Sequence, residues 1–281
     1  MERNDILQMI NKLWAESAEN RLSEELALRP ELAGMQIYEA PLVGFGSADD
    51  SLFEEYKKPE INGPWAMTPE EWLPGAKTVI SLFFPFTDEV KKSNRLQKDG
   101  PSSEWLHGRI EGQVFLTSFI DRLRDWFEAQ EIAACAPMTD PRFAAVRGGN
   151  NFHEYGIVTE RTFGSNWSER HAAFVCGLGT FSLSKGLITE KGMAGRFTSV
   201  IIGEKFKADI RPYTDIYEYC TKCGACIRRC PAGAIDLQTG KDHPICKAWL
   251  SRMAKLHALR YGCGLCQTGV PCESRNPKMR L

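Results

Sequence analysis

The cysteine spacing near the C-terminus restricts this chain more than any other feature. Four cysteines occur in "YCTKCGACIRRCP", residues 219–231, with the spacing C-x₂-C-x₂-C-x₃-C-P. The first three thiolates of such a run can wrap a loop around one iron–sulfur cubane, whereas the fourth points away and ligates a different cluster. One run therefore needs four partner cysteines elsewhere in the chain.

Four further cysteines supply that number. They are Cys246, Cys263, Cys266 and Cys272. By the logic of two-cluster ferredoxins, one cluster takes Cys220, Cys223, Cys226 and Cys272. The other cluster takes Cys230, Cys246, Cys263 and Cys266. Zinc is the alternative, but zinc sites favour two separated cysteine or histidine pairs over this spacing. We therefore expect two 4Fe–4S clusters.

The other two cysteines, Cys135 and Cys176, lie in apolar stretches and are expected to be buried thiols. The N-terminal sequence has no apolar signal-peptide core, and no stretch reaches the ~18 apolar residues of a membrane span. Ten cysteines without an export signal are expected to stay reduced, so we predict a cytoplasmic protein with no membrane partner.

The composition is that of an ordinary globular protein, with 43% hydrophobic and 25% charged residues in 281. The formal net charge of −1 gives no general attraction to nucleic acid, and we expect no nucleic-acid partner. Cysteine density rises and aliphatic strand runs stop near residue 210. The sequence thus predicts an α/β cofactor and substrate domain over 1–209 and a ferredoxin-like module over 210–281.

Hydrophobic periodicity predicts a layered α/β or α+β domain upstream of the cysteines. Helices are expected over 5–29 and 103–130, the second with Val114 on its apolar stripe. Residues 78–84 form an apolar run without alternation, typical of a strand covered on both faces, and another strand is expected over 132–137. The strand–helix–strand order then implies layers around one sheet.

The polar segment 140–170 is a long irregular stretch between these elements, which in a compact domain is usually functional. We expect it to form a wall of the substrate site. Arg142 and Arg147 within it could bind an anionic group, although solvent-exposed positions are the simpler interpretation.

Three segments together carry a family resemblance: the cysteine run, "AAFVCGLGTFSLSKGLIT" and "LPGAKTVISLFFPF". They resemble the superfamily of epoxyqueuosine reductases and reductive dehalogenases over roughly residues 40–275. The resemblance implies an α+β, nitroreductase-like domain that binds base-off cobalamin. It also implies a C-terminal module, similar to bacterial ferredoxins, with two 4Fe–4S clusters.

The resemblance also assigns corrinoid-binding residues in the glycine loop. These are Gly177, Leu178, Gly179, Ser182, Lys185 and Gly186. Glycines there would let the backbone approach a large planar ligand closely. The alternative is a helix C-cap with close packing inside the protein.

One departure from the family concerns the proton donor. The aspartate that epoxyqueuosine reductases use would fall near Phe163, so that acid is missing. Dehalogenase-like members use a tyrosine, and we predict Tyr155 as the catalytic acid, with His153, Glu169 and His171 as alternatives. A second departure is the longer "QTGVP" spacing before the last cysteine.

These observations predict a cobalamin-dependent iron–sulfur reductase acting on a small molecule. An external low-potential donor (a ferredoxin, a flavodoxin or a reductase) would supply the electrons. The helical-repeat module that helps epoxyqueuosine reductases hold tRNA is missing, so tRNA is not the expected substrate. Two alternatives stay open: an electron-transfer module serving a separate partner, and a protein that reduces corrinoid bound elsewhere.

Overall fold

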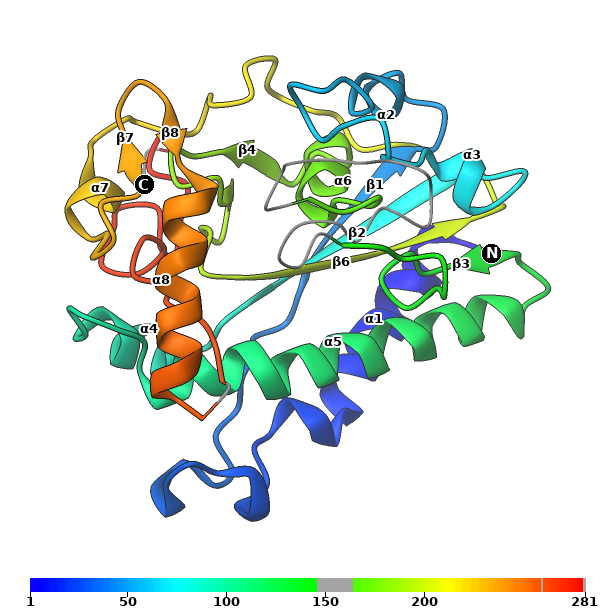
Figure 1. Ribbon diagram of the computed structural model, residues 1–281. Coiled ribbons are helices and arrows are strands. Elements are labelled where there is room, and N and C mark those ends of the chain that lie inside the picture. The colour runs from blue at the N-terminus through cyan, green and yellow to red at the C-terminus, as the bar shows by residue number, and fades with distance from the viewer. Residues whose placement is uncertain (146–163, 259, 280–281) are drawn as a thin grey trace.

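The computed structural model describes residues 1–145, 164–258 and 260–279. Its centre is a four-stranded sheet in the order β1-β2-β6-β3, in which every pairing is antiparallel (Figure 1). The strands are β1 (Leu42–Ser47), β2 (Thr78–Pro85), β6 (Gly195–Ile202) and β3 (Ala134–Cys135). Helices α5 (Ser103–Glu128) and α6 (Glu169–Val175) cover the two faces. The predicted α+β architecture is confirmed.

Strand β2 is the central element, and all eight of its residues are buried. Ile80, Leu82 and Phe84 face the core beneath α5, whereas Val79 belongs to the cluster that packs on α6. Both faces are therefore covered, which explains why the apolar residues of 78–84 do not alternate with polar ones.

Helix α5 confirms the helix predicted over 103–130. Its first turn is capped by Ser102, whose hydroxyl accepts a hydrogen bond from the Trp105 amide at 3.1 Å. One face buries a row of apolar side chains against the sheet: Phe115, Leu116, Phe119, Ile120, Leu123 and Phe127. The periodicity predicts Val114 on this stripe, but that residue lies outside the buried arc and is 58% exposed. That part of the prediction is wrong.

Helix α1 (Arg3–Glu16) is shorter than the helix predicted over 5–29. Three 3₁₀ turns follow it, Ala18–Asn20, Glu24–Leu26 and Pro30–Leu32. The cause is local side-chain bonding: the Ser17 hydroxyl donates to the Leu13 carbonyl at 2.6 Å, and the Asn20 amide bonds both backbone groups of Tyr38. Such side chains compete with continued helical hydrogen bonds.

The predicted strand 132–137 is reduced to the two residues of β3, which pair only with Ile201 and Ile202. Among the residues that the structure describes, no strand pairs with the outer edge of β6 from Arg196 to Val200.

The connection from the sheet to the C-terminal module begins with α6 and the hairpin of β4 (Gly179–Phe181) and β5 (Leu187–Thr189). The module contains α7 (Ala225–Arg228), the hairpin of β7 (Ile235–Asp236) and β8 (Gly240–Lys241), and α8 (His243–Leu256). Smaller helices α2 (Leu52–Glu55), α3 (Pro69–Trp72) and α4 (Asp88–Arg95) complete the fold. No described helix is long and apolar enough to cross a membrane.

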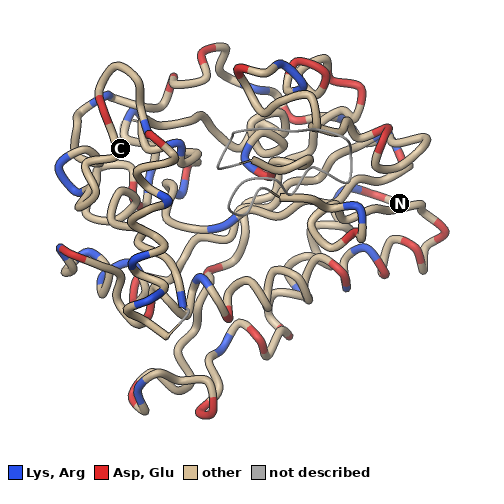
Figure 2. Tube along the Cα trace, viewed as in Figure 1, with Lys and Arg blue, Asp and Glu red and all other residues tan. Residues whose placement is uncertain are grey.

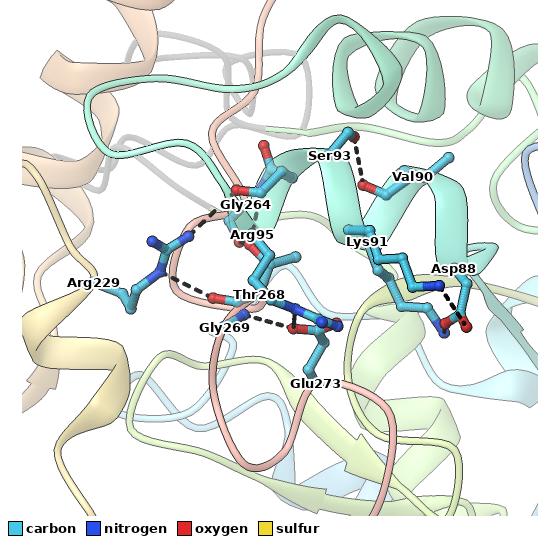
Figure 3. A network of polar contacts seen from close by, with 12 residues as sticks. Asp88, Val90, Lys91, Ser93, Arg95, Arg229, Gly264, Thr268, Gly269 and Glu273 are labelled. Atoms are coloured by element: carbon cyan, nitrogen blue, oxygen red, sulfur yellow. Dashed lines mark hydrogen bonds and ion pairs between the residues drawn. The ribbon is translucent and has the colours of Figure 1, made fainter.

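A polar network joins the module to α4 (Figure 3). Arg95 forms an ion pair with Glu273, whose carboxylate also accepts a hydrogen bond from the Gly269 amide at 2.5 Å. Arg229 donates to the carbonyls of Thr268 and Gln97 at 3.1 and 2.9 Å. Residues far apart in the sequence are thus fixed to one another, and the module cannot shift without breaking several charge-assisted bonds.

Candidate functional site

Four of the predicted ligands line one cavity of about 320 Å³, a volume that includes its opening. They are Cys220, Cys223, Cys226 and Cys272. Cys220 and Cys223 lie on the loop into α7, Cys226 lies in its first turn, and Cys272 reaches the cavity from the C-terminal segment. Apolar residues such as Leu183, Ile188 and Val270 form the rest of the wall. This grouping matches the set predicted for the first cluster.

Cys272 is held in the cavity by backbone pairing. The Met193 amide donates to the Cys272 carbonyl at 2.9 Å, and the Ala194 amide donates to the Glu273 carbonyl at 3.1 Å. Burial raises the pKa of Cys272 to about 12, and the neighbouring thiols of Cys220, Cys226 and Cys223 add to the shift. Cys272 is therefore close enough to the three cysteines of the 220–226 run to be affected by them, although it comes from a distant segment.

The second group of cysteines, Cys230, Cys246, Cys263 and Cys266, also interacts within itself. Burial raises the pKa of the Cys246 thiol, Lys241 lowers it, and Cys266 and Cys230 raise it further. Burial also raises the pKa of Cys263 to about 11, with Cys266 and Cys246 contributing. The Cys230 sulfur accepts a hydrogen bond from the Ala234 amide at 3.3 Å. The four ligands predicted for the second cluster are thus neighbours as well.

The two groups adjoin each other through Cys226 and Cys266: burial raises the pKa of Cys226 to about 11, and the largest further contribution comes from Cys266. Across residues 1–145, 164–258 and 260–279, no three His, Cys, Asp or Glu side chains converge closely enough to hold a single metal ion. In the first group, all four cysteines line one cavity.

A second candidate region lies at the edge of β6 that pairs with no described strand, and we call it the β6 bay. Its arginines are Arg196 on β6, Arg109 on α5 and Arg170 on α6. Acidic and basic residues are interspersed along much of the chain (Figure 2). The module contacts this region, because the Arg109 guanidinium lies 5.1 Å from the centre of the Tyr261 ring.

The bay is electrostatically connected to the second cysteine group. The Lys241 ammonium lies 3.8 Å from the Cys266 sulfur. Burial lowers the pKa of Arg170, Arg109 lowers it further, and Cys266 partly offsets both effects. A redox centre on these cysteines would therefore adjoin the bay directly.

Glu169 is a buried carboxyl at the start of α6. Its Oε2 atom accepts a hydrogen bond from the Ser199 hydroxyl at 2.7 Å. Burial raises the Glu169 pKa to about 7, while bonds from Ser199 and Trp167 and the charge of Arg196 partly oppose the rise. This carboxyl can therefore hold or release a proton near neutral pH.

A third polar group fixes the module on α5. Both oxygens of Glu111 accept hydrogen bonds from Arg260, at 2.8 and 2.7 Å. The Nε2 atom of His107 accepts from the Leu28 amide at 3.1 Å, so its Nδ1 atom carries the proton donated to Glu111 at 2.8 Å. Burial alone would raise the Glu111 pKa, but His107 and Arg260 outweigh burial and lower it to about 2.

We expect Glu111→Gln to remove a pH-dependent part of the stability. Because the folded pKa of about 2 is below the ordinary value of 4.5, the ionised group stabilises the fold above about pH 4.5. This contribution, on the order of 2 kcal/mol, disappears as the pH falls toward 2. Urea unfolding of both proteins from neutral to acid pH measures it: the difference should be largest at pH 7 and shrink in acid. A difference that does not change with pH would contradict the assignment.

The first part of the predicted corrinoid loop is packed inside the protein. Gly177 follows α6 with a φ of +78°, as a glycine at a helix C-terminus does. A side chain at Gly179 would collide with the Ile188 carbonyl across the β4–β5 hairpin. Leu178 lies against Gly44 of β1, at the edge of the sheet opposite β6 and β3. Internal packing accounts for both glycines, and their role toward a corrinoid stays a prediction.

The second part of that loop lies closer to the cysteines. Ser182 lines the first cysteine cavity, and its hydroxyl donates to the Gly186 carbonyl at 3.0 Å. The carbonyl of Lys185 accepts a bond from Arg170 at 2.5 Å, and its ammonium lies 3.4 Å from the Tyr217 hydroxyl. Of the predicted corrinoid residues, Lys185 is therefore the one that contacts a residue of the bay.

The predicted catalytic acid Tyr155 lies outside the described residues, as do His153 and Arg147. His171 bonds the Ser168 hydroxyl at 2.7 Å, and burial lowers its pKa to about 3, so it is neutral at physiological pH. Arg142 bonds Asp140 and the Trp72 carbonyl, both at 2.7 Å, which is a structural role.

Sequence reasoning missed the β6 bay. Its three arginines come from separate segments, 109, 170 and 196, and no local spacing links them. The one available signal was an arginine next to an otherwise apolar buried strand, "RFTSVIIG".

Comparison with known proteins agrees with the fold and with the cysteine chemistry. Residues 213–236 match the family described as "4Fe-4S binding domain". No sequence relative was found among curated proteins. An epoxyqueuosine reductase structure aligns with 95% of this chain and 66% of its own, at 19% identity and a TM-score of 0.53.

Two further structures show the same fold. The epoxyqueuosine reductase from Streptococcus thermophilus aligns at 15% identity and a TM-score of 0.53, over 99% of this chain and 68% of its own. A catabolic reductive dehalogenase aligns at 14% identity and a TM-score of 0.53, over 98% of this chain and 37% of its own. The chain thus shares the fold of the superfamily that its sequence resembles. It spans about two thirds of the length of these epoxyqueuosine reductases.

Proposed function

We propose that this chain is an iron–sulfur oxidoreductase that passes electrons through two 4Fe–4S clusters to a cobalamin, which reduces a small-molecule substrate. The observation that carries the proposal is the order of three neighbouring sites: the first group of four cysteines, then the second group of four, then the β6 bay. The 4Fe–4S binding domain covers the first run, and the fold is that of known reductases.

The direction of electron flow follows from exposure. Cys223 is exposed at the surface, so an external low-potential donor would dock over the cluster held by Cys220, Cys223, Cys226 and Cys272. Cys226 and Cys266 connect this cluster to the second one. Cys266 in turn adjoins Lys241 and Arg170 at the bay. Electrons would therefore enter at the surface and leave toward the bay.

The residues at the bay fit a cofactor that is rich in hydrogen-bond acceptors. Arg196 Nη1 and Thr198 Oγ1 are enclosed and have no hydrogen-bond partner within the described part of the chain. A corrinoid carries amide and phosphate oxygens that such donors can bind. When bound, it would supply a low-valent cobalt centre that accepts single electrons. Among the described residues, hydrogen-bond donors without a partner occur at the β6 bay and not along Gly177–Gly179.

The chain would supply the proton. Tyr155 stays our proposed proton donor, on the family resemblance. Glu169 is the alternative among the described residues, because its carboxyl is buried beside the bay and has a pKa of about 7. A group with that pKa is matched to proton transfer at neutral pH.

Anaerobic reconstitution tests the proposed function. We expect eight irons per chain, on the two sets of four cysteines, and a change of the cobalamin spectrum to the base-off form on addition of the protein. Four irons per chain would refute the second cluster. Eight irons without corrinoid binding would leave an electron-transfer module. Corrinoid reduction that needs a separate apoprotein would indicate a corrinoid-handling protein.

A further inference from the structure

We propose that Arg196 and Arg109 form a binding site for an oxyanion, a carboxylate or phosphate group, on the molecule that occupies the β6 bay. This inference deepens the proposed function by naming a chemical class of ligand. The site itself is defined by residues of this chain alone.

The first observation is an unsatisfied guanidinium. Arg196 Nη2 donates to the Gln113 side-chain oxygen at 2.5 Å, whereas Nη1 is enclosed and has no acceptor in the described structure. A buried donor without a partner destabilises the fold, and more so when it is charged. Gln113 is neutral, so the charge of Arg196 is not compensated by the bond that it makes.

The second observation is the absence of carboxylates where they would be expected. Ion pairs involve many arginines of this protein, for example Arg95 with Glu273 and Arg260 with Glu111. Within the described ranges, no acidic side chain forms an ion pair with Arg109 or Arg196. The charge of Arg196 lowers the Glu169 pKa, but burial has the larger effect and raises this pKa to about 7. Glu169 is therefore only partly ionised at neutral pH.

The third observation is that Arg196 and Arg109 lie next to each other. Arg196 bonds the Gln113 side chain, and Gln113 lies one helical turn from Arg109 on α5. Burial lowers the pKa of Arg196 to about 10, and Arg109 contributes to the lowering. Two like charges without an acidic partner among the described residues repel each other, and an anion would relieve this repulsion.

Arginine suits the assigned chemistry. Its planar guanidinium matches the two oxygens of a carboxylate or phosphate and binds them with paired hydrogen bonds. The anion has two sources: the nucleotide-loop phosphate of a corrinoid, or an acidic group on a separate substrate.

The experiment uses the reconstituted full chain and inorganic phosphate as the probe, with chloride at matched ionic strength as the reference. We expect saturating phosphate to raise the wild-type Tm by about 2–4 °C. In Arg196→Met this rise should be lost, while the Tm without phosphate stays equal or increases because an uncompensated buried charge is gone. Arg109→Gln should reduce the phosphate-dependent rise in Tm. Because Arg109 is partly exposed, this second variant keeps the test valid if Arg196→Met does not fold.

Arg124→Gln is the matched control, because Arg124 lies on α5 but pairs with Asp121 and Asp125. It should keep the full phosphate effect. A phosphate-dependent rise that persists in both Arg196→Met and Arg109→Gln overturns the site. The absence of any effect of phosphate on the Tm of the wild-type protein also overturns the site.

Corrinoid titrations then separate the two sources. If the anion is the cofactor's phosphate, Arg196→Met should bind cobalamin at least about tenfold more weakly and bind cobinamide, which lacks that phosphate, unchanged. If the anion belongs to a substrate, both corrinoids should bind both proteins equally. A protein that binds phosphate through Arg196 but binds no corrinoid would refute the cobalamin proposal and leave the anion site standing.

Discussion

Replacing Cys272 with serine should lower the iron content of the reconstituted protein from eight atoms per chain to about four, because one of two clusters loses a ligand. The spacing of this cysteine from Cys266 is unusual in the sequence, but the structure places its sulfur in the cavity of Cys220, Cys223 and Cys226. Iron and sulfide analysis, with the visible spectrum, measures the loss.

Cys135→Ser is the control for this experiment. Cys135 is also a buried thiol, but it lies on β3 beside Asp140 and far from the module in sequence. It should keep eight irons. A Cys272→Ser protein that keeps them would show that Cys272 is not a ligand, whereas complete iron loss would show that the two clusters assemble only together.

Replacing Gly192 with alanine should lower the free energy of unfolding by about 3–4 kcal/mol. It should also displace the segment that carries Cys272. Gly192 has a φ of +77°, and a Cβ atom there would come within 2.3 Å of the Glu273 carbonyl oxygen and 2.5 Å of the Ser274 amide nitrogen. These are backbone atoms that cannot rotate away, so the C-terminal segment must move. We expect Gly192→Ala to bind less iron as well.

Gly75→Ala is matched to this variant in backbone conformation. Its φ is +82°, but no atom lies within 4 Å of the position that a Cβ atom would take there. It should cost only the ~1–2 kcal/mol of a left-handed alanine. Denaturant unfolding measures the free energy of unfolding of both variants. An equal loss in Gly192→Ala and Gly75→Ala would mean that the close contact between Gly192 and Glu273 does not affect stability.

Much of the sheet and the cysteine grouping could be predicted because both depend on local patterns. Residues 78–84 indicate a fully buried strand through composition alone, and the spacing of Cys220 to Cys230 predicts which sulfurs share a cluster. Cysteine proximity in the structure agrees with that division. The ligand roles themselves stay predictions until iron is measured.

Other features depended on contacts that periodicity does not encode. Helix α1 ends at Glu16 because Ser17 and Asn20 find backbone partners, one of them on the distant Tyr38. Strand β3 is short, so no described strand pairs with β6 from Arg196 to Val200. The arginines of the bay come from three different elements, which no local pattern in the sequence links.

The bonds between the module and α4 have a consequence for the fate of the protein in a cell. Arg229 and Glu273 hold chain segments on both sides of the proposed cluster ligands, and Glu111 ties Arg260 to the longest helix. Binding of clusters to the folded state alone would therefore stabilise the whole chain and not only the module. Under iron limitation the same coupling would expose the entire protein to proteolysis, so that its abundance would follow the supply of iron.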